Sequence, residues 1–152
     1  MAQSRVRRSY RRLVEHVSPV PRVGVGVIIR RGDEMLLLRR RNVHGEGTWS
    51  SPGGHLDFGE EPAACAIREA AEETGLRVER VSFVGVTNDL FGEDRHYVTL
   101  WFVADAFTGE AVISAAYEMS ELDWFPVDRL PEPLFPPLGR VLKGECHGDG
   151  FR

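Results

Sequence analysis

Three glutamates, Glu69, Glu72 and Glu73, occupy positions i, i+3 and i+4 of a segment with helical character. In an α-helix this spacing places all three carboxylates on one face. Like charges at this spacing repel one another and destabilise a helix by about 0.2–0.5 kcal/mol per pair. Carboxylate oxygens are also the ligands that hard divalent cations such as Mg²⁺ prefer. A bound cation would therefore offset the repulsion.

The helix alone fits three interpretations: a solvated acidic face, a surface for a basic partner, or a divalent cation site. Solvation is the usual meaning of charges on a helix. Within the predicted helix, however, no Lys or Arg follows a glutamate at i+4 to pair with it.

The residues before the helix favour the cation site. Gly53 and Gly54 allow the backbone to approach a ligand closely. A pattern of fixed spacing then runs through Gly54, Glu60, Arg68, Glu69, Ala70, Glu72, Glu73, Gly75 and Leu76. Nine fixed positions make a specific signal, unlike a lone glycine motif. This pattern is the Nudix box, and on these residues the chain resembles the Nudix (MutT-like) hydrolases.

The resemblance covers residues 23 to 142 and includes VGVGV, PGGHLDFGE, RHYVTLWFVA and ELDWFPVDRLPEPLF, in that order. The chain is most similar to the branch of nucleoside-triphosphate diphosphatases that includes a human purine- and thiopurine-triphosphate diphosphatase. The resemblance implies an α/β (α+β) fold in which a mixed β-sheet lies between α-helices, an α/β/α sandwich. We expect a basic N-terminal arm at 1–20, a Nudix domain at 21–143 and a frayed C-terminal tail at 144–152.

Local patterns predict the elements that would position the box. A tight hairpin is expected at Arg31-Gly32-Asp33-Glu34, and a helix is expected from Pro62 to a stop at Gly75. Its predicted apolar face consists of Ala63, Ile67, Ala70, Ala71 and Thr74. Residues 42–62 read as one long loop. Strands are expected near 78–87, 96–106 and 122–125, and a last helix is expected from Leu134.

The resemblance implies hydrolysis of a nucleoside diphosphate linked to another group, with Mg²⁺ as cofactor and Mn²⁺ as a substitute. Divalent cations would neutralise the charge that develops when water attacks phosphorus. The expected metal ligands are Glu69 and Glu73, with Glu72 and the Gly53 carbonyl as further ligands. Either Glu72 or Glu73 would orient the water, and outside the box Glu93, Glu118 and Glu121 are alternative bases.

Arg68 belongs to the catalytic box, but its helical position is about a hundred degrees from Glu69. We therefore expect Arg68 to pair with Glu60 or a neighbouring carboxylate and hold the loop on the helix. Glu60 and Gly75 are expected to be structural members of the box. The expected substrate-binding residues are Arg40, Gly54, His55, Thr99, Phe135 and Leu138; for Phe135 and Leu138, packing in the core is the alternative.

The predicted reaction is cleavage of (deoxy)nucleoside triphosphates to the monophosphate and pyrophosphate, with sanitation of the nucleotide pool as one role. The alternatives are hydrolysis of a nucleotide sugar, ADP-ribose or a dinucleoside polyphosphate, and a non-catalytic Nudix module that senses a nucleotide. The resemblance also suggests a homodimer, to which the bare glycine face of VGVGV would contribute.

Composition limits the other classes of protein. The 152 residues carry a net charge of −4, so no global field favours nucleic acid. Two cysteines give no disulfide framework. The N-terminus lacks the apolar core of a signal peptide, and no apolar run is long enough to span a bilayer. We therefore expect a cytoplasmic protein that binds neither membrane nor nucleic acid.

Overall fold

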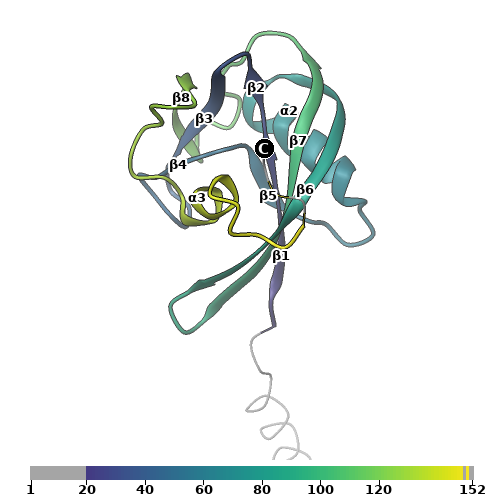
Figure 1. Ribbon diagram of the computed structural model, residues 1–152, viewed down its shortest axis with the longest axis vertical. Coiled ribbons are helices and arrows are strands. Elements are labelled where there is room, and N and C mark those ends of the chain that lie inside the picture. The colour runs from purple at the N-terminus through teal and green to yellow at the C-terminus, as the bar shows by residue number, and fades with distance from the viewer. Residues whose placement is uncertain (1–19, 149, 151–152) are drawn as a thin grey trace, which may run out of the picture.

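The structure, a computed structural model, describes residues 20–148 and 150, so nearly all of the predicted basic arm lies outside the described residues. Figure 1 shows a twisted arrangement of strands with one helix on either side. The strands are β1 (Arg22–Ile28), β2 (Arg30–Arg31), β3 (Glu34–Arg40), β4 (Trp49–Ser50), β5 (Gly53–His55), β6 (Arg77–Phe91), β7 (Arg95–Thr108) and β8 (Met119–Pro126). The helices are α2 (Pro62–Thr74) and α3 (Pro136–Leu142).

The strands form two sheets. In the first, the order is β5-β1-β7-β6, with β1 parallel to β7 and the other pairs antiparallel. In the second, β3 pairs with β2 and β4 and also with β8. The register of the first sheet places Gly24 beside Thr99 and Gly26 beside Trp101. The mixed sheet expected from the sequence is thus present.

The two helices cover opposite sides of the first sheet. Val25 and Val27 of β1 pack into a core with α2, whereas Ile28 packs with Leu138 and Val141 of α3. Because successive side chains of a strand point to opposite faces, β1 contributes to both cores. The α/β/α sandwich is therefore confirmed (Figure 1).

Helix α2 has the predicted limits, because Pro62 opens it and Gly75, with φ 70°, ends it in the left-handed region. The predicted apolar face is partly wrong. Ala63 and Ala71 are exposed, and the buried residues of the helix are Cys65, Ala66, Ala70, Glu73 and Thr74. A hydrophobic pattern could not select this face, since a glutamate lies within it.

The segment between β3 and α2 is not one structureless loop, because it contains β4 and β5. Strand β5 pairs with β1 and places Gly53 opposite Gly26. A Cβ at Gly53 would overlap the Val25 carbonyl oxygen. Glycine is therefore required where β5 approaches β1, and this approach holds the segment before the helix against the sheet.

The bare face of VGVGV is covered within the chain. The indole of Trp101 lies where a Cβ of Gly26 would be, and the Thr99 side chain lies 3.4 Å from the corresponding point at Gly24. Both glycines are buried. The expectation that this face contributes to a dimer is therefore wrong, because β7 of the same chain already occupies it.

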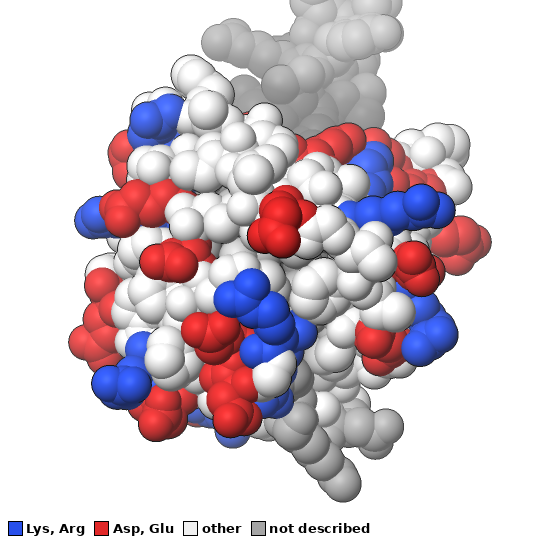
Figure 2. Space-filling view, turned by 90° about the horizontal axis from the view of Figure 1, so that it is seen from above, with Lys and Arg blue, Asp and Glu red and all other residues white. Residues whose placement is uncertain are grey.

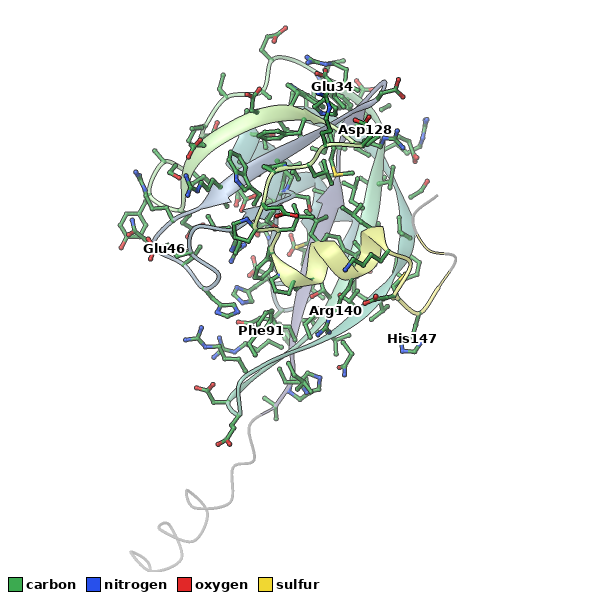
Figure 3. All side chains as sticks on the ribbon, turned by 60° about the vertical axis from the view of Figure 1, so that its left-hand side comes forward. Glu34, Glu46, Phe91, Asp128, Arg140 and His147 are labelled. Atoms are coloured by element: carbon green, nitrogen blue, oxygen red, sulfur yellow. The ribbon has the colours of Figure 1, made fainter. Side chains whose placement is uncertain are left out.

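Beyond α3, the described part of the predicted tail returns to the sheet at His147. The backbones of His147 and Val86 exchange two hydrogen bonds of 2.8 and 2.9 Å, so His147 lies beside the middle of β6 (Figure 3). On the face shown in Figure 2, basic and acidic side chains are interspersed and neither sign forms a continuous patch. Among the described residues, no helix is long and apolar enough to cross a membrane.

Candidate active site

A cleft of about 330 Å³ lies over β1 and β7. Its walls come from β5, from the end of β3 with the following loop, and from the segment that enters α3. A buried carboxylate, Glu73, lies at one end, and the aromatic rings of Phe91, Tyr97 and Phe135 line the other. The cleft thus joins an acidic end to an aromatic end.

Glu73 is the buried carboxylate of the cleft, with only 4% of the residue exposed. Its Oε2 accepts a 3.0 Å hydrogen bond from the backbone N–H of Gly53. Burial, and after it the charge of Glu69, raise the pKa of Glu73 to about 8, although the Gly53 hydrogen bond acts in the opposite direction. A positive charge beside Glu73 would stabilise its ionised form.

Glu69 lies one turn before Glu73 and is packed against Gly54, where a Cβ would overlap its carboxylate. Gly54 itself lines the cleft. Burial raises the pKa of Glu69, while the guanidinium of Arg68, 2.8 Å away, lowers it. Two partly desolvated carboxylates one turn apart are an oxygen-donor set that suits a hard divalent cation. The residues present therefore fit Mg²⁺.

Arg68 ties the loop before α2 to the helix. Its Nε donates a 2.7 Å hydrogen bond to Oε1 of Glu60, and one terminal nitrogen lies 2.9 Å from Oε2. This bidentate pair, together with the Asp57 backbone N–H, lowers the pKa of Glu60 to about 2. The same hydrogen bonds raise the pKa of Arg68. The pairing expected between Arg68 and Glu60 is thus observed.

The three glutamates do not share one site in this structure. The side chain of Glu72 is 58% exposed and lies 3.2 Å from Arg68, which precedes it by four residues, so a pairing partner exists although none follows at i+4. In the part of the chain that the structure describes, no three acidic, His or Cys side chains converge as a metal site. Helical spacing fixes the positions of the three Cα atoms, whereas hydrogen bonds from Arg68 to Glu69 and Glu72, and from Gly53 to Glu73, orient the carboxylates.

A further carboxylate enters the cleft from outside the helix. Of the three alternative bases, Glu118 lines the cleft. Glu121 is held in an ion pair of 2.7 Å with Arg39, and Glu93 lies in the turn between β6 and β7. The charge of Glu118 contributes to the raised pKa values of Glu69 and Glu73. Glu118 is therefore the candidate base that faces the acidic end.

The aromatic end is built on Phe135. Its ring is stacked with Phe91 at 5.7 Å between centroids and an interplanar angle of 11°, and the Arg40 guanidinium lies 4.2 Å from its centroid. Arg40 also donates a 2.7 Å hydrogen bond to the His44 carbonyl, and burial lowers the pKa of Arg40. A planar ring and a cation at this end are suited to a nucleobase and its phosphates.

His44 and Phe91 were missed in the sequence. Nδ1 of His44 lies 2.8 Å from Arg95, which can only donate, so the ring is neutral with its proton on Nε2. Burial and the charges of Arg95 and Arg40 lower the pKa of His44. Its ring meets Phe91 edge-on at 4.3 Å. The one available signal for Phe91 was an aromatic residue next to a glycine, between the strands expected near 78–87 and 96–106.

The remaining predicted binding residues divide between cleft and core. Gly54, His55 and Thr99 line the cleft, and the ring of His55 lies 3.3 Å from the Tyr97 hydroxyl. Leu138 does not line it: this residue is fully buried in the core beneath α3. The expectation that Leu138 contacts the base is therefore wrong, because α3 turns it toward the sheet.

The chain is similar in sequence and in fold to known proteins. Among curated relatives, an uncharacterized Nudix hydrolase of Bacillus subtilis, YvcI, is 31% identical over 129 residues, covering 82% of this chain and 78% of that protein. An ADP-ribose pyrophosphatase of Methanocaldococcus jannaschii is 32% identical, covering 76% and 68%. A MutT NUDIX hydrolase crystal structure from Burkholderia pseudomallei has a TM-score of 0.76 and 33% identity, covering 79% of this chain and 94% of that one.

The family profile of the NUDIX domain matches residues 20–143. This range holds the whole sandwich from β1 to α3, the helix with its paired loop, and every residue of the cleft. Nudix hydrolases generally use divalent metal ions, typically Mg²⁺, in agreement with the oxygen donors at the acidic end. The chain therefore belongs to the Nudix hydrolase family.

Proposed function

We propose that the protein is a Mg²⁺-dependent pyrophosphohydrolase that cleaves (deoxy)nucleoside triphosphates to the monophosphate and pyrophosphate, with Mn²⁺ as a substitute. The observation that carries the proposal is the single cleft with a buried carboxylate at one end and a cation over an aromatic ring at the other. Its volume of about 330 Å³ lies at the low end for ligand pockets. That size favours one nucleoside over the two of a dinucleoside polyphosphate.

At the acidic end, Glu69 and Glu73 would hold the metal, and a bound metal ion would neutralise charge on the phosphates. The Gly53 carbonyl would be a further ligand, and Glu72, which is exposed on the same helix, would be an outer one. Glu118 accepts the proton of the attacking water, since it lines the cleft, whereas Glu121 is held in an ion pair with Arg39. The assignment leaves Glu73 free to act as a ligand.

The other contacts follow the length of the cleft. Arg68 acts indirectly, by holding Glu60 and the loop at a fixed place on the helix. His55 and the Gly54 backbone contact the phosphates, and Arg40 reaches them from its place over the ring of Phe135, while the base lies against the aromatic end. The ring's neighbour Phe91 completes the base site.

A substrate panel tests the proposal. The four ribo- and four deoxynucleoside triphosphates, ADP-ribose, a nucleotide sugar and diadenosine tetraphosphate are incubated with Mg²⁺, and pyrophosphate and phosphate release are measured. Pyrophosphate from a triphosphate, with little turnover of the rest, is the expected result. ADP-ribose is the second candidate, because one relative is an ADP-ribose pyrophosphatase. If no triphosphate yields pyrophosphate, the proposal is wrong.

A non-catalytic nucleotide sensor is the alternative of another class. Glu73→Gln separates the two, because an enzyme loses most of its turnover while a sensor keeps its binding. Circular dichroism checks the fold of the variant. We further propose a cytoplasmic homodimer whose Nudix domain spans 21–143 and which removes modified nucleotides from the pool. Light scattering after size exclusion tests the dimer, and a panel of oxidised nucleotides tests the role.

A further inference from the structure

Asp89 is a buried carboxylate that the proposed reaction does not use. It lies near the end of β6 and is 1% exposed. Its Oδ2 accepts hydrogen bonds from the hydroxyls of Thr87, at 2.7 Å, and Thr99, at 2.8 Å. Its Oδ1 lies 3.3 Å from Arg140 of α3. Figure 3 shows Arg140 on α3, beside the strands of the β6–β7 hairpin that carry Phe91. Asp89 thus gathers donors from three elements beside the cleft-lining Thr99.

The directions of these hydrogen bonds are determined by chemistry. Arg140 can only donate, and the carboxylate oxygens of Asp89 accept its hydrogen bond. The Thr87 hydroxyl donates to Asp89 and accepts a 2.9 Å hydrogen bond from the Trp101 indole N–H. The single hydroxyl proton of Thr99 is likewise used by Asp89. Thr99 therefore offers the cleft oxygen lone pairs and no proton.

The register of β7 places this acceptor in the middle of the cleft. Tyr97, Thr99 and Trp101 alternate along the strand and all line the cleft. Trp101 lies over Gly26, whose neighbour Gly53 binds Glu73. Tyr97, two residues the other way, contacts Phe91 of the aromatic end at 6.2 Å. Thr99 thus lies between the acidic and aromatic ends.

In a nucleotide, the sugar lies between the phosphates and the base. Given the orientation in the proposed function, on which this inference rests, the sugar lies over Thr99. We propose that Thr99 accepts a hydrogen bond from a sugar hydroxyl of the bound nucleotide, and that Asp89 is the positioning residue that keeps the Thr99 proton turned away from the cleft. The site then selects nucleotides whose sugar carries a hydroxyl donor.

Sugar analogues on otherwise identical nucleotides test the contact. The ratio of kcat/KM for each deoxynucleoside triphosphate to that of its 2′,3′-dideoxy counterpart is measured with Mg²⁺. Wild type is expected to prefer the hydroxylated nucleotide about fivefold, the effect of one neutral hydrogen bond. Thr99→Val, which keeps the shape and removes the oxygen, brings the ratio to one. Thr99→Ser restores it.

Asp89→Asn tests the positioning role. Because Arg140 only donates, the amide oxygen takes the place of Oδ1 and the amide N–H₂ faces Thr99. The hydroxyl oxygen of Thr99 then accepts a hydrogen bond from this amide. The ratio of kcat/KM for the deoxy and dideoxy nucleotides therefore falls toward one. A residue that was merely structural would lower both kcat/KM values equally. Thr108→Val is the matched control for Thr99→Val, because Thr108 lies at the exposed far end of β7, the strand that carries Thr99. This variant keeps the wild-type ratio.

The outcomes separate this inference from the proposed function. Turnover of both nucleotides with equal kcat/KM in wild type, or a wild-type ratio in Thr99→Val, overturns the sugar contact and leaves the triphosphatase activity standing. A wild-type ratio in Asp89→Asn overturns the positioning role. If no triphosphate is hydrolysed, the proposed function is overturned. Calorimetric titration with deoxy- and dideoxynucleoside monophosphates then tests the sugar contact, with the ratio of their affinities in place of the ratio of kcat/KM. If neither monophosphate binds, the sugar contact is overturned as well.

Discussion

The backbone N–H of Gly53 donates a 3.0 Å hydrogen bond to Oε2 of Glu73. Gly53 lies in β5 and Glu73 lies in the last turn of α2. This hydrogen bond therefore joins the strand before the helix to the helix itself, and both residues line the cleft. It orients a carboxylate that burial would otherwise favour in its neutral form. Through the ionisation of Glu73, the stability of the fold is therefore expected to depend on pH and on metal binding.

Glu73→Gln is expected to change the pH dependence of stability. The pKa of Glu73 is raised from 4.5 to about 8, so between these pH values the folded state binds the proton that the unfolded state has lost. The free energy of unfolding of wild type therefore falls as pH rises through this window. The variant lacks this fall and is more stable than wild type at pH 8, by about 2 kcal/mol or more.

Urea denaturation in EDTA at pH 5 and pH 8 measures this difference. Glu72→Gln is the matched control, because its side chain is largely exposed on the same helix. Wild type and Glu73→Gln with parallel stability profiles would contradict a desolvated carboxylate at this position.

Mg²⁺ is expected to raise the Tm of wild type, because it binds the folded state and relieves the repulsion between Glu69 and Glu73. At a hundredfold excess over Kd, the added stability is about 2.7 kcal/mol. Scanning calorimetry with Mg²⁺ and with EDTA gives the shift. Glu69→Gln should lose most of it, whereas Glu121→Gln, which alters a carboxylate paired with Arg39, should keep it. A Tm of wild type that ignores Mg²⁺ would argue against the site.

Glu118→Gln is expected to lower kcat about a hundredfold with little change in KM, as for loss of a general base. The amide keeps the size of the side chain but cannot accept the proton of water. Steady-state kinetics on the best triphosphate measures the loss. Glu121→Gln is the control, three residues along the chain, and should retain most activity. Equal activity of Glu118→Gln and wild type would return the role of base to the helix.

Phe135→Ala and Leu138→Ala should have different effects although only two residues separate them. Phe135 lies in the aromatic end of the cleft, so its loss should raise KM about tenfold, as for loss of base stacking. Leu138 is fully buried in the core, so its truncation should lower the free energy of unfolding by about 2–5 kcal/mol. Kinetics and urea denaturation on both variants check the contrast; a raised KM in folded Leu138→Ala would contradict it.

Much of the fold follows from local rules. Pro62 and Gly75 determined the limits of α2, because a proline is tolerated in the first helical turn and a glycine adopts the left-handed conformation at the end. Gly32, with φ 60°, likewise determined the first hairpin. The spacing of the box identified Glu69, Glu73 and the pair of Arg68 with Glu60. Each of these signals lies in a short stretch of chain.

What only the tertiary structure decided is which of several chemically equal side chains meets the cleft. Glu73 is buried and Glu72 exposed because β5 packs on one side of α2. Leu138 and Phe135 are separated by the turn into α3, and Phe91 joins Phe135 from a strand far away in sequence. Local sequence sets backbone conformation, whereas the surroundings of a side chain, which set its pKa and its contacts, depend on segments that only folding brings together.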